Sequence, residues 1–261
     1  MPIVQPTNKS VLDYKGLHLY HSDRSNCSAR VRLLLEEKEL PWVSHQLSLM
    51  DKENVTEEYF GINPKGLVPA LIHDGIVVTE SNDILCYLEE NFPNPSFRKV
   101  SDADQSKIDW WLQTSGDVHL PGIKTLQYYN RLAKMLKKTE ETYERYQSLQ
   151  KDPELKKFHA KHGAPGSSLT EEDAKGANQL MDGVFEKMEL ALSKSEWIVG
   201  DTYTLADISW GPTFTTMTIG GFNFDRYPNV QAWYKRISAR PQYDKANFQW
   251  IRESPWGHQK T

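Results

Sequence analysis

The stretch that decides the fold of this chain reads Asn63-Pro64-Lys65-Gly66-Leu67-Val68-Pro69-Ala70-Leu71, and Thr79-Glu80-Ser81 begins ten residues after its second proline. An apolar run starts directly at Pro69, and a proline is accepted at the first residue of a strand. Such a proline, held in a tight turn, is a candidate for a cis peptide bond. Val68 would then turn its backbone N–H and C=O outward, where an extended peptide can pair with them.

The Glu80-Ser81 pair stands where a strand-like run at 77–79 gives way to a helical run from Asp83. Ser81 is therefore a candidate helix cap or first helical residue, and the unpaired N–H groups of a helix start favour an anion. Glu80 adds a negative charge that could meet an ammonium group. A backbone clamp, an anion cradle and a counter-charge together suit a small zwitterionic peptide such as glutathione.

These residues resemble the glutathione-binding half of the cytosolic glutathione transferases over about residues 16–95. The resemblance implies a thioredoxin-like α/β N-terminal domain at 16–95 and an all-α C-terminal domain at 104–261. Strand-like runs fall near 17–20, 42–47, 70–73 and 76–79, with Asp74-Gly75 as a two-residue hairpin turn. Residues 1–15 are polar with two prolines, which indicates a loosely held arm.

A second motif, Ser25-Asn26-Cys27-Ser28-Ala29-Arg30-Val31-Arg32, follows the first strand-like run and has the composition of a helix start. It looks like the corresponding segment of serine-type transferases of the zeta and tau kind. In that family the first serine, here Ser25, donates a hydrogen bond to the glutathione sulfur. A free thiol has a pKa of about 8.5, so a hydroxyl donor at the positive end of a helix would favour the nucleophilic thiolate. The resemblance thus implies that Ser25 is catalytic.

Two residues of this segment have competing interpretations. Ser25 alone would more often be an ordinary helix cap, and its order and spacing relative to Pro69, Glu80 and Ser81 favour catalysis. Cys27 would more often be a small buried apolar residue. The alternative is that Cys27 forms a mixed disulfide with glutathione and gives the protein thiol-transfer or isomerase activity.

Two lysines are candidates for the glycine carboxylate of glutathione, namely Lys52 and Lys65. Exposed lysines are common, so the competing interpretation is a solvated side chain. Leu67 departs from the family pattern, because many relatives carry a polar side chain just before the Val-Pro pair. That departure leaves room for a third class of function, a non-catalytic binding module on the same fold.

Composition excludes several classes of protein. The 261 residues suit one large or two small domains, and the net charge of −4 argues against nucleic acid as a partner. No apolar run approaches the ~20 residues that span a membrane, and the N-terminal residues 1–9 lack the apolar h-region of a signal peptide, so no secretion is expected. Two cysteines make no disulfide framework, so a reducing cytoplasm is expected. His159 and His162 have metal-like spacing without a third ligand nearby, so no metal is assigned.

The second half of the chain shows helical periodicity over 104–136, 139–160, 170–194, 205–218 and 228–238. Thr204 and Asp207 resemble a capping box, which would be structural. The connection at 137–170 is long, and long connections are more often functional than neutral. It looks similar to an insertion in the bacterial β-etherases, and a comparable insertion occurs in the ganglioside-induced differentiation-associated relatives.

The resemblance also implies the remaining features of the function. The glutathione thiolate would attack a hydrophobic or aromatic electrophile, or in the β-etherase version would displace a phenol from a lignin-type β-aryl ether. The electrophile pocket of such transferases lies between the domains, which makes Trp111, His119 and Phe214 candidates. Trp250 and Trp256 could cover that pocket. Glutathione is the expected co-substrate, and a homodimer is expected from the family.

Overall fold

A five-stranded mixed sheet forms the N-terminal half of the chain in the computed structural model, which describes residues 3–98, 100–136 and 139–254. The strands are β1 (Ile3–Val4), β2 (Leu17–His21), β3 (Trp42–Gln46), β4 (Ala70–His73) and β5 (Ile76–Thr79), in the spatial order β1-β5-β4-β2-β3. β2 and β3 run parallel, and every other neighbouring pair is antiparallel. This arrangement confirms the thioredoxin-like α/β class.

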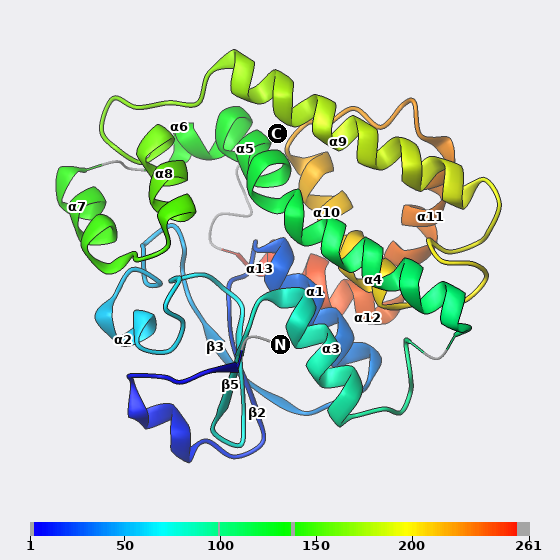
Figure 1. Cartoon of the computed structure of the whole chain (residues 1–261), viewed down its shortest axis with the longest axis horizontal. Helices are drawn as coiled ribbons and strands as arrows, with labels where there is room; N and C mark the ends of the chain where they lie inside the picture. Colours follow the sequence, from blue (N-terminus) through cyan, green and yellow to red (C-terminus); the bar gives the residue numbers. More distant parts are fainter. Residues whose placement is uncertain (1–2, 99, 137–138, 255–261) are drawn as a thin grey trace.

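Side chains alternate between the two faces of the sheet, as the two-residue period of a strand requires. Leu19 and Leu71 pack toward α1 (Asn26–Glu37) and α3 (Ser81–Asn91), in the apolar core shared with the second half of the chain. Ile72 packs on the opposite face in a smaller core, together with residues of α2 (Glu57–Phe60) and of the 3₁₀ helix η1 (Lys9–Asp13). One face of the sheet therefore supports the contact between the two halves of the chain (Figure 1).

The N-terminal segment differs from the loosely held arm that its composition indicates. Ile3 and Val4 pair with Val78 and Val77 as an added edge strand, and Val11 is 0% exposed. β5 would otherwise present an unpaired row of N–H and C=O groups, so pairing with the segment covers that edge. The prolines that suggested an arm stand outside the paired residues.

The second half of the chain is all helical within the described residues. One long helical run consists of α4 (Asp102–Asp117), the π turn η2 (His119–Lys124), α5 (Thr125–Gln127), the π turn η3 (Tyr128–Leu132) and α6 (Ala133–Met135). It is followed by α7 (Glu140–Leu149), α8 (Pro153–His162), α9 (Glu171–Leu192), α10 (Leu205–Ile219), α11 (Pro228–Ser238), α12 (Pro241–Tyr243), the π turn η4 (Asp244–Phe248) and α13 (Gln249–Glu253). α7 and α8 extend to one side of the bundle, beside the segment of α2 (Figure 1).

Capping side chains fix where two helices of the second half begin. The single helix expected at 139–160 is two helices, because Asp152 caps a new start and Pro153 occupies its first position. The capping box of Thr204 and Asp207 is present at the start of α10. Asp207 is buried and also accepts hydrogen bonds from Trp233 Nε1 at 2.8 Å and from the N–H of Ile198 at 3.0 Å. That carboxyl therefore joins three segments of the helical half.

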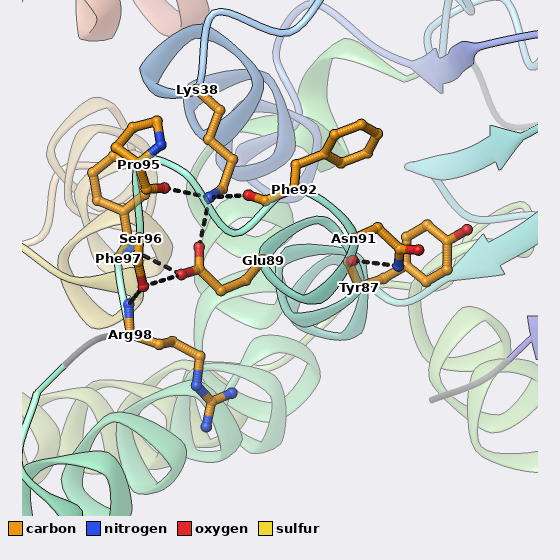
Figure 2. A network of polar contacts seen from close by, with 9 residues as sticks. All are labelled: Lys38, Tyr87, Glu89, Asn91, Phe92, Pro95, Ser96, Phe97 and Arg98. Carbon is orange, nitrogen blue, oxygen red and sulfur yellow. Dashed lines mark hydrogen bonds and ion pairs between the residues drawn. The ribbon is translucent and has the colours of Figure 1, made fainter.

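A buried ion pair fixes the connection between the two halves. Lys38 Nζ lies 2.8 Å from Glu89 Oε2 and donates to the carbonyl oxygens of Phe92 and Pro95 at 2.7 and 2.5 Å. Glu89 also accepts hydrogen bonds from the Ser96 hydroxyl and from the backbone N–H of Phe97 (Figure 2). Helices α1 and α3 and the chain that leaves α3 are thus joined by one network. No helix among the described residues has the length and apolar character to cross a membrane.

Candidate functional site

A cavity of about 710 Å³ is lined by both halves of the chain. Nine residues that the sequence singles out line it: Ser25, Cys27, Lys52, Lys65, Val68, Pro69, Glu80, Ser81 and His119. They come from the start of α1, the loops around α2, the start of α3 and the π turn η2. Segments far apart in the sequence therefore present polar groups to one shared cavity, as expected of a ligand site.

The start of α1 points its capping serine at this cavity. Ser25 is the N-cap, and its Oγ accepts a hydrogen bond of 3.2 Å from the backbone N–H of Ser28. The hydroxyl is an acceptor in that bond, so its own hydrogen can be donated to a ligand. The same atom thus serves both as the structural cap and as a donor that a thiolate could use.

Cys27 stands two residues farther along the helix, also in the cavity wall. Its Sγ lies 3.7 Å from each ring nitrogen of His119. Burial raises the pKa of the Cys27 thiol, but the charges of His119 and Arg30, with hydrogen bonds from His119 and Ser81, outweigh it and lower that pKa to about 6. A thiol in such a setting is largely thiolate at neutral pH.

Arg30 supplies part of that positive charge and was not singled out from the sequence. Its guanidinium donates to the carbonyl oxygen of Ser209 at 2.8 Å, to Thr213 Oγ1 at 2.8 Å and to Ser81 Oγ at 3.2 Å. It is 1% exposed and joins α1 to α3 and α10. The sequence signal that could have identified it is an arginine close before the apolar run Leu33-Leu34-Leu35, since an arginine is rarely fully buried without partners.

The opposite wall holds Val68 and the Lys65–Glu80 pair. The peptide bond between Val68 and Pro69 is cis, as the sequence suggested. Lys65 Nζ and Glu80 Oε1 are 2.8 Å apart, so two residues predicted for different ends of a ligand bind each other here. Glu80 has a φ of 64° and Lys52 a φ of 61°, both in the left-handed region that non-glycine residues rarely adopt. Such conformations concentrate at functional sites.

The 137–170 insertion builds a third wall through its helices α7 and α8. Its lining residues are Thr142, Tyr143, Tyr146, Asp152, Glu154, Leu155, His159, His162 and Gly163. The insertion faces Lys124 and Tyr128 of the long helical run, which line the same cavity. The hairpin of α7 and α8 is therefore part of the site and not a peripheral addition.

Family models match both halves of this chain. The model described as "Glutathione S-transferase, N-terminal domain" matches residues 19–96, and the one described as "Glutathione S-transferase, C-terminal domain" matches residues 153–241. Protein LigF of Sphingobium sp. is 32% identical over an alignment of 192 residues that covers 69% of this chain and 73% of LigF. This chain belongs to the glutathione S-transferase family.

Other relatives agree with that assignment. Glutathione S-transferase F13 of Arabidopsis thaliana is 25% identical and covers 89% of this chain and 95% of its own. The crystal structure of the β-etherase LigF superposes with a TM-score of 0.75 at 27% identity, covering 89% of this chain and 98% of that one. A transferase from Phanerochaete chrysosporium, crystallised with oxidized glutathione, has a TM-score of 0.69 at 22% identity, which shows the shared fold.

Two residues predicted for the second-substrate pocket of this transferase do not line the cavity. Trp111 is 5% exposed, and its carbonyl oxygen accepts a hydrogen bond of 3.0 Å from Trp210 Nε1. Phe214 is 4% exposed and stacks on Phe224, with ring centroids 3.9 Å apart. Both predictions were wrong because these rings fill the helical core, which is where most aromatic side chains of such helices are placed. His119 alone of the three reaches the cavity.

The C-terminal tryptophans do not form the predicted cover over the pocket in the part of the chain described. Trp250 packs edge-on against His21, with ring centroids 4.7 Å apart, and Arg32 lies 5.0 Å above its ring. These partners belong to β2 and α1 and do not line the cavity. Trp256 lies outside the described residues.

The histidine pair of α8 lies side by side in the cavity wall. The ring centroids of His159 and His162 are 4.8 Å apart. Over residues 3–98, 100–136 and 139–254, no group of three or more His, Cys, Asp or Glu side chains is placed to hold a metal ion.

Proposed function

We propose that this transferase binds glutathione along the wall formed by Val68, Glu80 and Ser81 and uses its thiolate as a nucleophile. The observation that carries this proposal is the single cavity lined by these three residues and by the start of α1. The backbone of Val68 pairs with the extended peptide, while the N–H groups at the start of α3 donate hydrogen bonds to the γ-glutamyl carboxylate. Pro69 holds the Val68 backbone in place.

The charged ends of glutathione replace an existing ion pair. Lys65 and Glu80 are 44% and 43% exposed, and exchange of so exposed a pair costs little. Glu80 would then bind the ammonium group of glutathione. Lys65, with Lys52 in the same cavity, would bind its glycine carboxylate.

The sulfur lies at the start of α1 in this proposal. The free hydrogen of the Ser25 hydroxyl and the positive end of the helix both favour the thiolate over the thiol. The thiolate attacks an electrophilic carbon, a C–S bond forms, and the leaving group departs with its electron pair. Holding the two substrates side by side contributes much of the rate.

The second substrate is a hydrophobic aromatic compound, and we propose a lignin-type β-aryl ether. The relationship to LigF, which is named a β-etherase, supports this choice. The tyrosines of the α7–α8 wall offer apolar ring surface for an aromatic group. In that reaction the leaving group is a phenolate.

A second candidate is thiol transfer by Cys27, favoured by the position of its Sγ beside His119 and its pKa of about 6. The Cys27 thiolate would attack one sulfur of glutathione disulfide, form a mixed disulfide and release glutathione thiolate. A glutathione-dependent isomerisation differs from transfer because its product retains no glutathione. A non-catalytic binding module would give neither product.

We also propose a homodimeric cytoplasmic protein divided into domains at 16–95 and 104–261. Two free cysteines are consistent with a reducing compartment. Sedimentation of the purified chain tests the oligomeric state.

The deciding experiment is the thiolate difference absorbance of bound glutathione across pH. It is measured in native protein, in Ser25→Ala and in Cys27→Ala, each against the same protein without glutathione so that the protein's own thiols cancel. A lowered pKa of bound glutathione that reverts in Ser25→Ala and persists in Cys27→Ala is expected. An unchanged pKa in Ser25→Ala contradicts the serine mechanism, and no binding at all contradicts the proposed function.

A further inference from the structure

One cation in the cavity has no role in the binding of glutathione just described. Lys124 closes the π turn η2, and its Nζ lies 5.3 Å from the ring centroid of Phe158 and 5.9 Å from that of Tyr128. Its other neighbour is His159, whose Nε2 is 3.4 Å away. The ammonium group is therefore held between aromatic faces in the wall where the long helical run meets α8.

Within residues 3–98, 100–136 and 139–254 no carboxylate contacts this charge. Among the described residues no Asp or Glu oxygen lies within 4.0 Å of Lys124 Nζ, whereas Lys65 in the same cavity is paired with Glu80. Burial lowers the pKa of Lys124 to about 8. The Cys27 thiolate is the anionic group whose charge acts on Lys124, without a direct contact. A partly desolvated cation that no carboxylate contacts attracts an anion more strongly than a solvated one does.

His159 positions the ammonium group without neutralising it. An ammonium group can donate a hydrogen bond and cannot accept one, so His159 Nε2 must be the acceptor. Burial and then the nearby charge of Lys124 lower the pKa of His159, which keeps the imidazole neutral. The remaining hydrogens of the ammonium group are left for a ligand.

Lys124 lines the same cavity as Ser25, where the proposal places the glutathione sulfur, and as the neighbouring Cys27. His119 and Lys124 stand at the two ends of the same π turn, and His119 contacts Cys27 at the start of α1. The charges of Cys27 and Lys124 are close enough to act on one another. A substrate seated on the α7–α8 wall would thus contact Lys124 and share the cavity with the glutathione sulfur proposed at Ser25.

We propose that Lys124 binds the oxygen on which negative charge develops as the aromatic substrate reacts, and that the α7–α8 wall holds its ring. This inference rests on the proposed function and names a residue for its leaving-group step. The C–S bond forms from the glutathione thiolate, the C–O bond breaks, and its electron pair stays on the phenolate oxygen beside Lys124. The ammonium group gives that oxygen a proton and regains one from solvent, so the products are a thioether and a phenol.

The test compares aryl ethers that differ only in the acidity of the phenol released. For the native enzyme the rate should fall gently from nitrophenol to methoxyphenol ethers. For Lys124→Met we expect a loss of about 100-fold with methoxyphenol and less than about 3-fold with nitrophenol, because a good leaving group needs little charge stabilisation. Lys124→Arg keeps the charge and should keep the gentle slope. Lys157→Met, an exposed lysine of α8, serves as the matched control.

Equal losses by Lys124→Met with all phenols would overturn the inference, since a purely structural lysine affects every substrate alike. A second measurement needs no turnover. The pKa of 4-nitrophenol bound to the glutathione-loaded protein should be lowered in native protein and in Lys157→Met, and should return to its solution value in Lys124→Met. Native protein that binds nitrophenol without lowering its pKa would also overturn it. If the native protein does not bind glutathione, the result would instead contradict the proposed function.

Discussion

Gln150 Nε2 donates a hydrogen bond of 2.8 Å to the backbone carbonyl oxygen of Lys65. Gln150 ends α7, is 0% exposed, and also contacts the hydroxyl of Tyr146 at 3.0 Å. Lys65 belongs to the loop that leads to Val68. A residue of the insertion therefore reaches the glutathione side of the cavity, and the position of one wall is tied to that of the other.

Replacing Gln150 with Ala should loosen the α7–α8 wall. The part-buried carbonyl of Lys65 loses its donor, which costs about 1 kcal/mol in the free energy of unfolding. We expect KM for the aromatic substrate to rise more than KM for glutathione. Urea denaturation and two-substrate kinetics measure the two effects. Ser148→Ala, on the exposed side of α7, is the control. An equal rise in both KM values would contradict a larger effect on the α7–α8 wall than on the glutathione side.

The pH dependence of Cys27 alkylation should reveal its surroundings. Iodoacetamide reacts with the thiolate, whose fraction rises as pH passes the pKa. With that pKa at about 6, the rate should already be level at neutral pH. His119→Ala removes a positive neighbour, so the pKa rises and the curve moves to higher pH. The measurement uses Cys86→Ser protein, which leaves one thiol. A native midpoint near that of a free thiol, about 8.5, would refute the assignment.

Lys38→Met should destabilise the junction between the two halves strongly. The substitution leaves Glu89 as a buried charge without its cation and removes the donor to the carbonyl oxygens of Phe92 and Pro95. Breaking a buried pair on one side costs about 3–5 kcal/mol. Chemical denaturation measures the free energy of unfolding, with the exposed pair variant Lys107→Met as control. A loss below about 1 kcal/mol would show that the network contributes little.

Trp250→Ala should lower stability and leave substrate binding unchanged. The ring packs on His21 and Trp42 and beneath the guanidinium of Arg32, away from the cavity. Because it is only partly buried, we expect a cost of about 2 kcal/mol, below that of a core tryptophan. Thermal unfolding and steady-state kinetics on the same preparation separate the two effects. A raised KM for the aromatic substrate with normal stability would restore the idea of a cover.

Residues whose geometry is fixed locally could be predicted from the sequence. The Val68–Pro69 turn, the cap at Ser25 and the capping box at Thr204 each depend on a few neighbouring side chains. The fold class followed from the resemblance that these motifs carry to the glutathione transferases, and the sheet of five strands with its helical second half confirms it.

Residues whose role depends on tertiary packing could not be predicted. Periodicity places Trp111 and His119 in one helical run, but it does not show that the first ring faces the core and the second the cavity. In the sequence nothing distinguishes Lys124 from a solvent-exposed lysine, because its aromatic neighbour Phe158 comes from a helix of the insertion. Ile3 and Val4 form a strand only because β5 offers a free edge.

The two π turns of the long helical run are positions where the chain can lose a residue without breaking the helix. A π turn holds one residue more than the α-helical turn it replaces. Loss of one residue between His119 and Lys124 could therefore be absorbed as a regular turn, with the helix before and after it still in register. The side chains redirected by such a deletion would be those that face the cavity. Natural length variants of this helix should accordingly alter the choice of substrate while sparing the fold.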